Sequence, residues 1–240
     1  MNKEFKANLS QLKKRAFTLA ETLIVMGIIG VVAALTLPNL NSSTGEKEKV
    51  AKVKKIYSDL NDAFGRAQAV YGPFDEWFVN DGRDYDKKDK RAFDRITEFL
   101  KSSKVCDTST QCAIPIIDHN GSSGESDRAV ILADGATVVF DRDWYFQPEV
   151  AIDIDGPNKG PNASGKDSFM FYISQNDGIH VGNDIDSKHH VYMNGDVISA
   201  FDSAAWIINF DNMDYLKTSD GTTCPDGKTK LTWGGNHSCK

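Results

Sequence analysis

A segment dense in oxygen-bearing side chains, residues 153–167, is the part of the chain best suited to hold a metal ion. Its candidate ligands are Asp153, Asp155, Asn158, Asn162 and Asp167. Calcium takes roughly six to eight oxygens from carboxylates, carbonyls and water, so a loop that folds back on itself would offer a structural calcium site. The spacing is not that of an EF-hand, because Gly156 comes too early and no Glu stands at the twelfth position. The alternative is a rigid turn whose Asp and Asn side chains bond their own backbone.

Signals of enzymatic chemistry are missing from the sequence. His180, His189 and His190 do not have the H-E-x-x-H spacing, and neither a G-x-S-x-G elbow nor a phosphate-binding loop occurs. The tryptophans and tyrosines are more typical of packing than of sugar binding. A net charge of −6 and a pI near 5.4 argue against a nucleic-acid binder. The sequence predicts a protein that is not an enzyme and requires no cofactor.

One acidic residue lies inside a long apolar run. Residues 17–37 read FTLAETLIVMGIIGVVAALTL, and Glu21 is their only charge. As a helix this run spans roughly 30 Å, the thickness of the hydrocarbon core of a bilayer. It is longer than the apolar part of an ordinary signal peptide, and it is apolar on every face, which is unusual for a core helix. It is therefore expected to enter a membrane.

The charges on either side of the run indicate its orientation. Residues 1–16 hold five basic residues and one acidic residue, whereas the whole chain is acidic. Basic flanks stay on the cytoplasmic side, so the acidic remainder is expected outside the cytoplasm. A carboxylate in lipid costs about 3 kcal/mol without a partner. Because the run has no Lys or Arg, the partner of Glu21 must come from another chain or from a free amine. The alternative is a Glu that is protonated or reaches the membrane surface.

Residues 15–21 (RAFTLAE) resemble the processing site of type IV pilins and type II secretion pseudopilins. The resemblance implies that a prepilin peptidase cuts between Ala16 and Phe17 and methylates the new amine of Phe17. Glu21 then becomes the fifth residue of the mature chain, where this family carries a Glu. The chain has Ala16 where the family usually has Gly. In a filament, Glu21 of one subunit would pair with the Phe17 amine of a neighbour.

The resemblance also implies where the protein resides and what it contacts. The chain would be a single-pass protein of the inner membrane, with its N-terminus in the cytoplasm and its head in the periplasm, before it joins a filament. Its partners would be the prepilin peptidase, other pilins or pseudopilins, the inner-membrane assembly platform and, before assembly, membrane lipid. The filament is either a type II secretion pseudopilus or a type IV pilus-like fibre. The alternative is a minor tip pilin that acts as an adhesin or a substrate-binding module. Some pseudopilins hold calcium in a C-terminal loop, which favours calcium binding by residues 153–167.

The four cysteines are expected to form disulfides if the head is exported to an oxidising compartment. They are Cys106, Cys112, Cys224 and Cys239, and they allow three connectivities. The local pairs 106–112 and 224–239 are the simplest, because each closes a short loop without regular structure. By resemblance, the second pair would close a C-terminal loop as pilins do. A zinc site is the rival, but the sequence lacks C-x₂-C pairs.

Four segments are expected from these patterns: a leader at residues 1–16, a membrane and assembly helix at 17–38, an amphipathic stem helix at 39–72 and a head at 73–240. The polar residues 39–46 suggest a loosened stretch, after which Ser43 and Glu46 would begin a fresh helix with a capping box. An apolar heptad stripe then marks the stem. Its members are Val50, Val53, Tyr57, Leu60, Phe64, Ala67 and Tyr71.

The head reads as one helix followed by antiparallel strands. The helix is expected at residues 91–102. Strands are expected at residues 129–133, 136–141, 150–154, 168–174 and 179–181, with a two-residue type I′ turn at Asp134-Gly135. Residues 204–210 fit a strand or a short helix. The predicted fold class is α+β: a long N-terminal helix packed on an antiparallel sheet of three to five strands, pilin-like.

Overall fold

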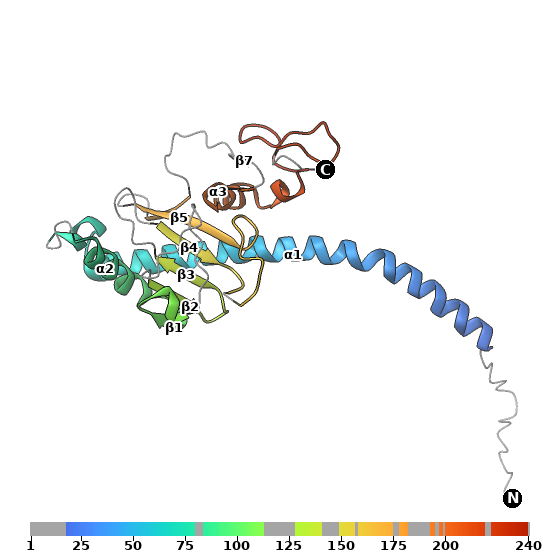
Figure 1. Ribbon diagram of the computed structural model, residues 1–240, viewed down its shortest axis with the longest axis horizontal. Helices are drawn as coiled ribbons and strands as arrows, with labels where there is room; N and C mark the ends of the chain where they lie inside the picture. The colour runs from blue at the N-terminus through green and yellow to red at the C-terminus, as the bar shows by residue number, and fades with distance from the viewer. Residues whose placement is uncertain are drawn as a thin grey trace, which may run out of the picture. The chain divides into compact units, whose positions relative to one another are not determined.

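The computed structural model describes residues 18–79, 84–112, 128–140, 149–156, 158–174, 178–181, 193–194, 197–198, 200–218 and 222–239 (Figure 1). At residues 33–44, 85, 109–110, 193–194, 197–198 and 200–202 it describes the backbone alone. The chain divides into two compact units, Met1–Gly45 and Glu46–Lys240. The second unit is called the head below. It includes the stem part of the N-terminal helix, residues 46–71, besides the head that the sequence predicts.

Helix α1, Leu19–Tyr71, is continuous through the stretch that the sequence predicts to be loosened. Asn, Ser, Thr and Gly lower helix propensity by less than about 1 kcal/mol each relative to Ala. Extending an existing helix through such residues costs less than ending it and nucleating a new one a few residues later. The expected fresh helix at Ser43 is therefore wrong.

The head contains a six-stranded antiparallel sheet in which each strand neighbours the next in the sequence (Figure 1). Its strands are β1 (Ser102–Cys106), β2 (Arg128–Leu132), β3 (Thr137–Phe140), β4 (Glu149–Asp153), β5 (Ser168–Ser174) and β6 (Gly178–His180). A separate pair is formed by β7 (Met193–Asn194) and β8 (Val197–Ile198). An N-terminal helix packed with an antiparallel sheet confirms the predicted α+β class. The predicted number of three to five strands is wrong, because the edge strand β1 is exposed along most of its length and so has no apolar pattern in the sequence.

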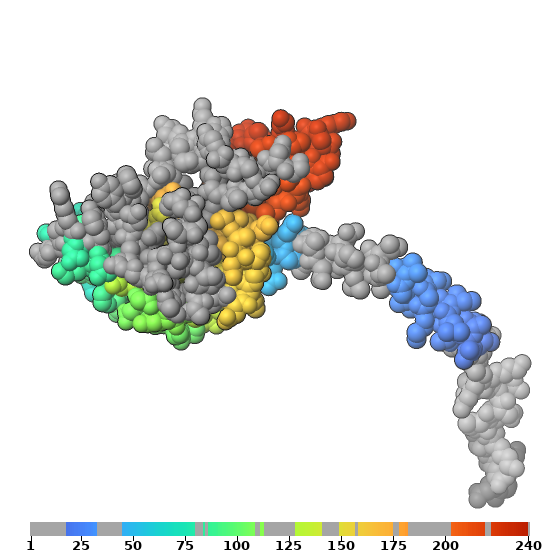
Figure 2. Space-filling view, viewed as in Figure 1, coloured from blue at the N-terminus to red at the C-terminus, as the bar shows by residue number. Residues whose placement is uncertain are grey.

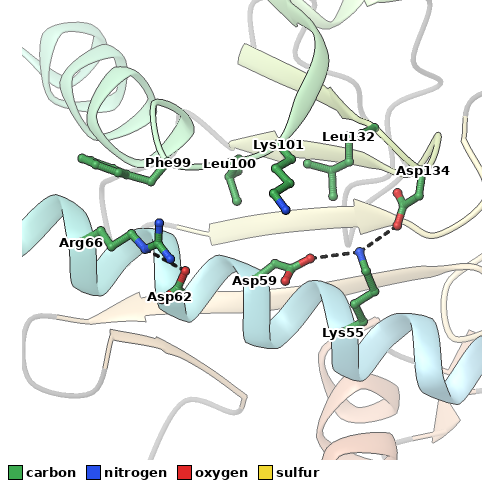
Figure 3. Close-up of a pocket in the computed structure, with 10 residues that line it drawn as sticks. Lys55, Asp59, Asp62, Arg66, Phe99, Leu100, Lys101, Leu132 and Asp134 are labelled. Atoms are coloured by element: carbon green, nitrogen blue, oxygen red, sulfur yellow. Dashed lines mark hydrogen bonds and ion pairs between the residues drawn. The ribbon is translucent and has the colours of Figure 1, made fainter.

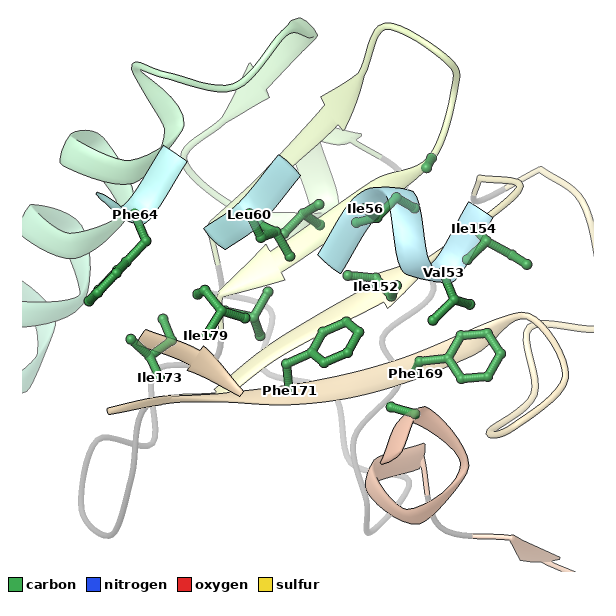
Figure 4. Close-up of a cluster of buried hydrophobic side chains, with 14 of the residues drawn as sticks. Val53, Ile56, Leu60, Phe64, Ile152, Ile154, Phe169, Phe171, Ile173 and Ile179 are labelled. Atoms are coloured by element: carbon green, nitrogen blue, oxygen red, sulfur yellow. The ribbon is translucent and has the colours of Figure 1, made fainter. Parts of the chain in front are cut away.

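The stem part of α1 supplies one side of the main core. Val53, Leu60 and Phe64 of the heptad stripe are at most 2% exposed, and Ile56, which lies beside the stripe, is fully buried. Figure 4 shows these side chains facing apolar residues of the sheet. The sheet residues labelled there are Ile152, Phe169, Phe171, Ile173 and Ile179, and Ile154 directly follows β4. Tyr71 ends the stripe at 36% exposure, because α1 stops there.

Both faces of the central strands β2 to β5 are buried, and successive side chains alternate between them. In β3, Val138 and Phe140 join the core against α1, whereas Val139 joins a smaller cluster on the opposite face. In β4 the same alternation places Val150 and Ile152 in the main core. This period of two is what a pleated strand imposes.

The remaining helices differ from their predicted positions. Helix α2 is Tyr85–Thr97 instead of 91–102, because the Asp84 side chain accepts a hydrogen bond from the Lys87 backbone N–H and so caps an earlier start. The apolar residues 204–210 belong to a helix, α3 (Ala200–Phe210), which lies beside β5. Three short 3₁₀ segments complete the described elements: η1 (Phe74–Phe78), η2 (Ser109–Cys112) and η3 (Asp214–Lys217).

The turn of the β2–β3 hairpin has three residues instead of the predicted two. The Leu132 N–H donates to the Ala136 carbonyl, so residues 133–135 form the turn. Gly135 takes a φ of +90° there, a conformation that residues with a side chain rarely adopt. The type I′ prediction for Asp134-Gly135 is therefore wrong, although the hairpin itself is present.

Candidate functional site

Glu21 lies in the first turn of α1 and forms a capping box with Thr18. The Thr18 backbone N–H and hydroxyl both donate to Glu21 Oε2 at 2.9 Å, and the Glu21 backbone N–H donates to the Thr18 hydroxyl at 3.2 Å. A capping box satisfies backbone donors that a helix start would otherwise leave unpaired. Glu21 Oε1 receives no donor from the described residues, so this oxygen is available to an amine. The predicted processing residues Ala16 and Phe17 lie outside the described residues.

The apolar side chains that follow Glu21 are exposed. From Leu19 to Val32, the large apolar residues are 53% to 81% exposed. Within the part of the chain that the structure describes, no helix is both long enough and apolar enough to cross a membrane. The structure describes the predicted membrane span, residues 17–37, only in part. Phe17 lies outside the described residues, and the side chains of residues 33–37 are not described.

The four cysteines form two disulfides. Cys106 bonds Cys112 with a Cα–Cα distance of 5.9 Å, and Cys224 bonds Cys239 at 5.4 Å. The first links the end of β1 to η2, and the second closes a loop of the C-terminal segment. These are the two local pairs. A pair fifteen residues apart stabilises a fold by about 3 kcal/mol in the chain-entropy model.

The C-terminal segment is also attached to the rest of the head by hydrogen bonds. The Cys239 N–H donates to Asp214 Oδ2 at 2.7 Å, and the Tyr215 hydroxyl donates to the Gly165 carbonyl at 2.8 Å. In Figure 2 the red C-terminal segment accordingly borders the yellow segment that contains Gly165. Trp206, Trp233 and His237 form one aromatic cluster with Phe210, which agrees with a packing role for these rings.

The segment 153–167 brings together three of its five predicted ligands. With its amide nitrogen facing Asp153, Asn162 donates to Asp153 Oδ2 at 3.0 Å and to the Lys159 carbonyl at 2.5 Å. Asp153 Oδ1 accepts from the backbone N–H groups of residues 155 and 156. Asp155 Oδ1 is buried without a donor among the described residues.

The other two predicted ligands have different surroundings. Asp167 accepts the backbone N–H groups of Asn162 and Ala163 at 2.9 and 2.6 Å, so it closes the turn. Asn158 is exposed. Among the described residues, no three His, Cys, Asp or Glu side chains form a group that could hold a metal ion. Any cation here would therefore need the amide of Asn162 and backbone carbonyls besides two carboxylates.

Burial gives Asp153 unusual electrostatics for an aspartate. Asp153 is only 2% exposed. Burial, followed by the neighbouring Asp155 carboxyl, raises the pKa of Asp153 to about 6, although the N–H groups of residues 155 and 156 oppose the shift. Two carboxyls in contact favour either a shared proton or a cation between them.

A buried ion cluster that sequence patterns do not predict joins α2 to β2. Arg128, at the start of β2, is 8% exposed and forms ion pairs with the fully buried Asp89 and with Asp86, the latter at 3.1 Å. The only signal in the sequence is the position of Arg128, which directly precedes an apolar strand that has to be buried. The cluster holds α2 against the sheet.

Of the three histidines that the sequence analysis names, one lies within the described residues. His180 lies in β6, with its ring tilted against that of Tyr172 at 5.9 Å between centroids, while His189 and His190 lie outside the described residues.

Two family models match the chain. The model described as "Family of unknown function (DUF6613)" matches residues 39–197, which is more than half of the chain. The model described as "Prokaryotic N-terminal methylation motif" matches residues 11–37, and it confirms the resemblance of the N-terminus to prepilins. Compared with curated proteins and with solved structures, the chain matches none. The chain therefore carries the methylation motif of type IV pilins and pseudopilins and belongs to the family of unknown function DUF6613.

Proposed function

We propose that this chain is a structural pilin or pseudopilin subunit, processed by a prepilin peptidase and polymerised through its N-terminal helix. The filament is a type II secretion pseudopilus or a type IV pilus-like fibre. The observation that carries the proposal is the order of features at the N-terminus. The methylation motif at residues 11–37 contains the start of helix α1, with a carboxylate, Glu21, in its first turn and exposed apolar side chains after it.

The exposed apolar surface of α1 supports polymerisation. Side chains such as Leu19, Ile24 and Val31 are 81%, 62% and 62% exposed. An apolar surface of this extent is covered by lipid or by another protein surface. In the proposed cycle the helix first lies in the inner membrane, with the N-terminus in the cytoplasm and the head in the periplasm. Neighbouring helices replace the lipid when the inner-membrane assembly platform adds the subunit to a filament.

Labelling of filaments tests this proposal and distinguishes a structural subunit from a minor tip pilin. The full chain is produced in a host that has the peptidase and the assembly platform, and sheared filaments are stained with an antibody against the head. Labelling along the whole length is expected of a structural subunit. Labelling at one end alone would instead support a minor tip pilin that acts as an adhesin or a substrate-binding module. A chain absent from filaments would reject both the structural subunit and the tip pilin.

We further propose that residues 153–167 bind a structural calcium ion through oxygens of Asp153, Asp155 and Asn162 and the Lys159 carbonyl. The side chains that face one another there support this assignment, as does the buried Asp155 Oδ1, which has no donor among the described residues. Calcium would rotate the Asn162 amide so that its oxygen faces the ion, and would keep both carboxyls ionised.

Calcium is expected to raise the melting temperature of the head, Glu46–Lys240. At about a hundred times its Kd, the increase is roughly 5–10 °C for a domain of this size. Asp155→Asn removes one carboxylate and is expected to abolish most of the increase, whereas Asp226→Asn, in the C-terminal segment, should leave it unchanged. If millimolar calcium leaves the melting temperature of the unmodified head unchanged, the segment is a self-bonded turn.

A further inference from the structure

A row of polar side chains crosses three strands on the face of the sheet that points away from α1. Thr137 of β3 is paired with Asp153 of β4, which in turn is paired with Ser168 of β5. Residues paired in this way point to the same face of an antiparallel sheet. Ile152 and Phe169, which are neighbours of these residues in the sequence, face α1 (Figure 4), so the three polar side chains point to the opposite face.

The row is buried, and two of its members lack hydrogen bonds. Thr137 and Ser168 are fully buried, and Asp153 is 2% exposed. Among the described residues, neither Thr137 Oγ1 nor Ser168 Oγ has a hydrogen-bond partner. The next row on the same face is apolar and consists of Val139, Ala151 and Met170. Because native proteins usually satisfy buried hydroxyls, these two oxygens indicate that the polar row surrounds a water or an ion.

A close contact between two loops places Thr137 beside the segment that follows β4. The turn that leads into Thr137 contains Gly135, and a Cβ atom added to Gly156 would lie 2.4 Å from the Gly135 carbonyl oxygen. A side chain at Gly156 would therefore collide with the turn. Lys55 of α1 also holds this turn, through an ion pair with Asp134 at 3.0 Å (Figure 3). The hydroxyl of Thr137 thus lies at the end of the sheet where the segment leaves β4.

We propose that the hydroxyl oxygens of Thr137 and Ser168 complete the coordination of a calcium ion bound by the segment 153–167. The inference rests on the calcium site proposed above, which takes one oxygen from each of Asp153, Asp155, Asn162 and Lys159. The two hydroxyls raise the number of protein oxygens from four to six, which reaches the roughly six to eight that calcium takes. A water alone would leave two neighbouring carboxylates without a positive charge to balance them, so the site favours an ion.

This arrangement favours calcium over magnesium and over monovalent ions. Magnesium usually keeps several of its waters and demands a near-octahedral site, whereas calcium accepts a larger and less regular set of protein oxygens. The charge of a divalent ion also balances the two carboxylates of Asp153 and Asp155. Bound there, the ion joins β3, β4 and β5 at one end of the sheet.

Removal of the Thr137 hydroxyl tests the inference in the full chain, purified in detergent and freed of calcium with a chelator. Thr137→Val keeps the shape of the side chain but removes the ligand oxygen, so calorimetric titration is expected to give a Kd for calcium about ten-fold higher. Without calcium, the same variant is expected to melt no lower than the unmodified chain, because valine replaces a buried hydroxyl that has no partner among the described residues. A hydroxyl with only a structural role would not raise the Kd.

Thr97→Val is the matched control. The Thr97 hydroxyl is also buried, but it donates to the Phe93 carbonyl at 2.6 Å within α2. Its loss is expected to lower the melting temperature without calcium and to leave the Kd unchanged. Ser168→Ala is expected to raise the Kd as Thr137→Val does. Magnesium is expected to bind the unmodified chain at least about a hundred-fold more weakly than calcium.

Terbium luminescence counts the waters that remain on the bound ion. Terbium takes the place of calcium, and its luminescence lifetimes in H₂O and in D₂O together give the number of bound waters. Thr137→Val is expected to gain about one water, which replaces the hydroxyl. An unchanged Kd and an unchanged water count in Thr137→Val and Ser168→Ala would overturn this inference alone and leave the segment 153–167 as a site with four ligands. An unmodified chain that binds neither ion would reject both this inference and the calcium proposal, without bearing on the proposed filament subunit.

Discussion

Replacement of Glu21 by Gln is expected to reduce filament yield at least about a hundred-fold while leaving cleavage before Phe17 intact. Gln keeps an oxygen that can accept the two Thr18 donors, and it is a normal partner in a capping box, so the start of α1 is preserved. It has no charge to offer the Phe17 amine of a neighbour. An unpaired charge in an apolar filament interior costs several kcal/mol, which corresponds to two or more orders of magnitude in assembly. The measurement is the quantity of sheared filament per cell.

Two companion variants separate charge pairing from helix capping. Glu21→Ala loses both roles and is expected to be as defective as Glu21→Gln. Thr18→Ala loses the hydroxyl of the capping box but keeps the carboxylate, so it should cost about 1 kcal/mol of helix stability and reduce assembly only modestly. If Thr18→Ala is as defective as Glu21→Gln while both chains are cleaved normally, capping explains the role of Glu21 and the pairing argument fails.

Arg128→Ala is expected to destabilise the head by about 3–5 kcal/mol, the cost of leaving a buried charge without its partner. The carboxylate of Asp89 is fully buried, and Arg128 supplies its ion pair from β2. The double variant Arg128→Met/Asp89→Leu removes both charges and should recover most of the loss, because a buried pair contributes little more than an apolar pair of similar volume. Urea unfolding of the head, Glu46–Lys240, gives the free energies of unfolding.

A surface pair provides the control for that series. Lys90 and Asp94 are one helical turn apart on α2, at 2.8 Å, with side chains 50% and 53% exposed. Lys90→Ala is expected to cost less than about 0.5 kcal/mol. If Arg128→Ala destabilised the head no more than Lys90→Ala does, burial would not determine the strength of this cluster.

The stem and the central strands can be predicted from the sequence because burial on one face imposes a period. Val53, Leu60 and Phe64 repeat at helical spacing and are buried, and residues 168–174 form β5 over the same range as predicted. The N-terminal motif is equally local, since RAFTLAE places Glu21 at a fixed distance from Phe17. Such features need no knowledge of contacts between distant segments.

Features that depend on distant contacts could not be predicted. Strand β1 (SSKVC) lacks an apolar alternation because it is an edge strand, exposed along most of its length. The ion pair of Asp89 and Arg128 joins residues thirty-nine positions apart. In the segment 153–167, the sequence shows five oxygen ligands, but only the folded turn shows that Asp167 bonds backbone N–H groups and that Asp153 and Asp155 meet.

Mass spectrometry of the mature N-terminus tests the central claim most directly. The full chain is purified from cells with and without the prepilin peptidase, and the terminal peptide is sequenced. We expect residues 1–16 to be absent and the chain to begin at an N-methylated Phe17 only when the peptidase is present. A chain that retains residues 1–16 in cells with an active peptidase would contradict the account.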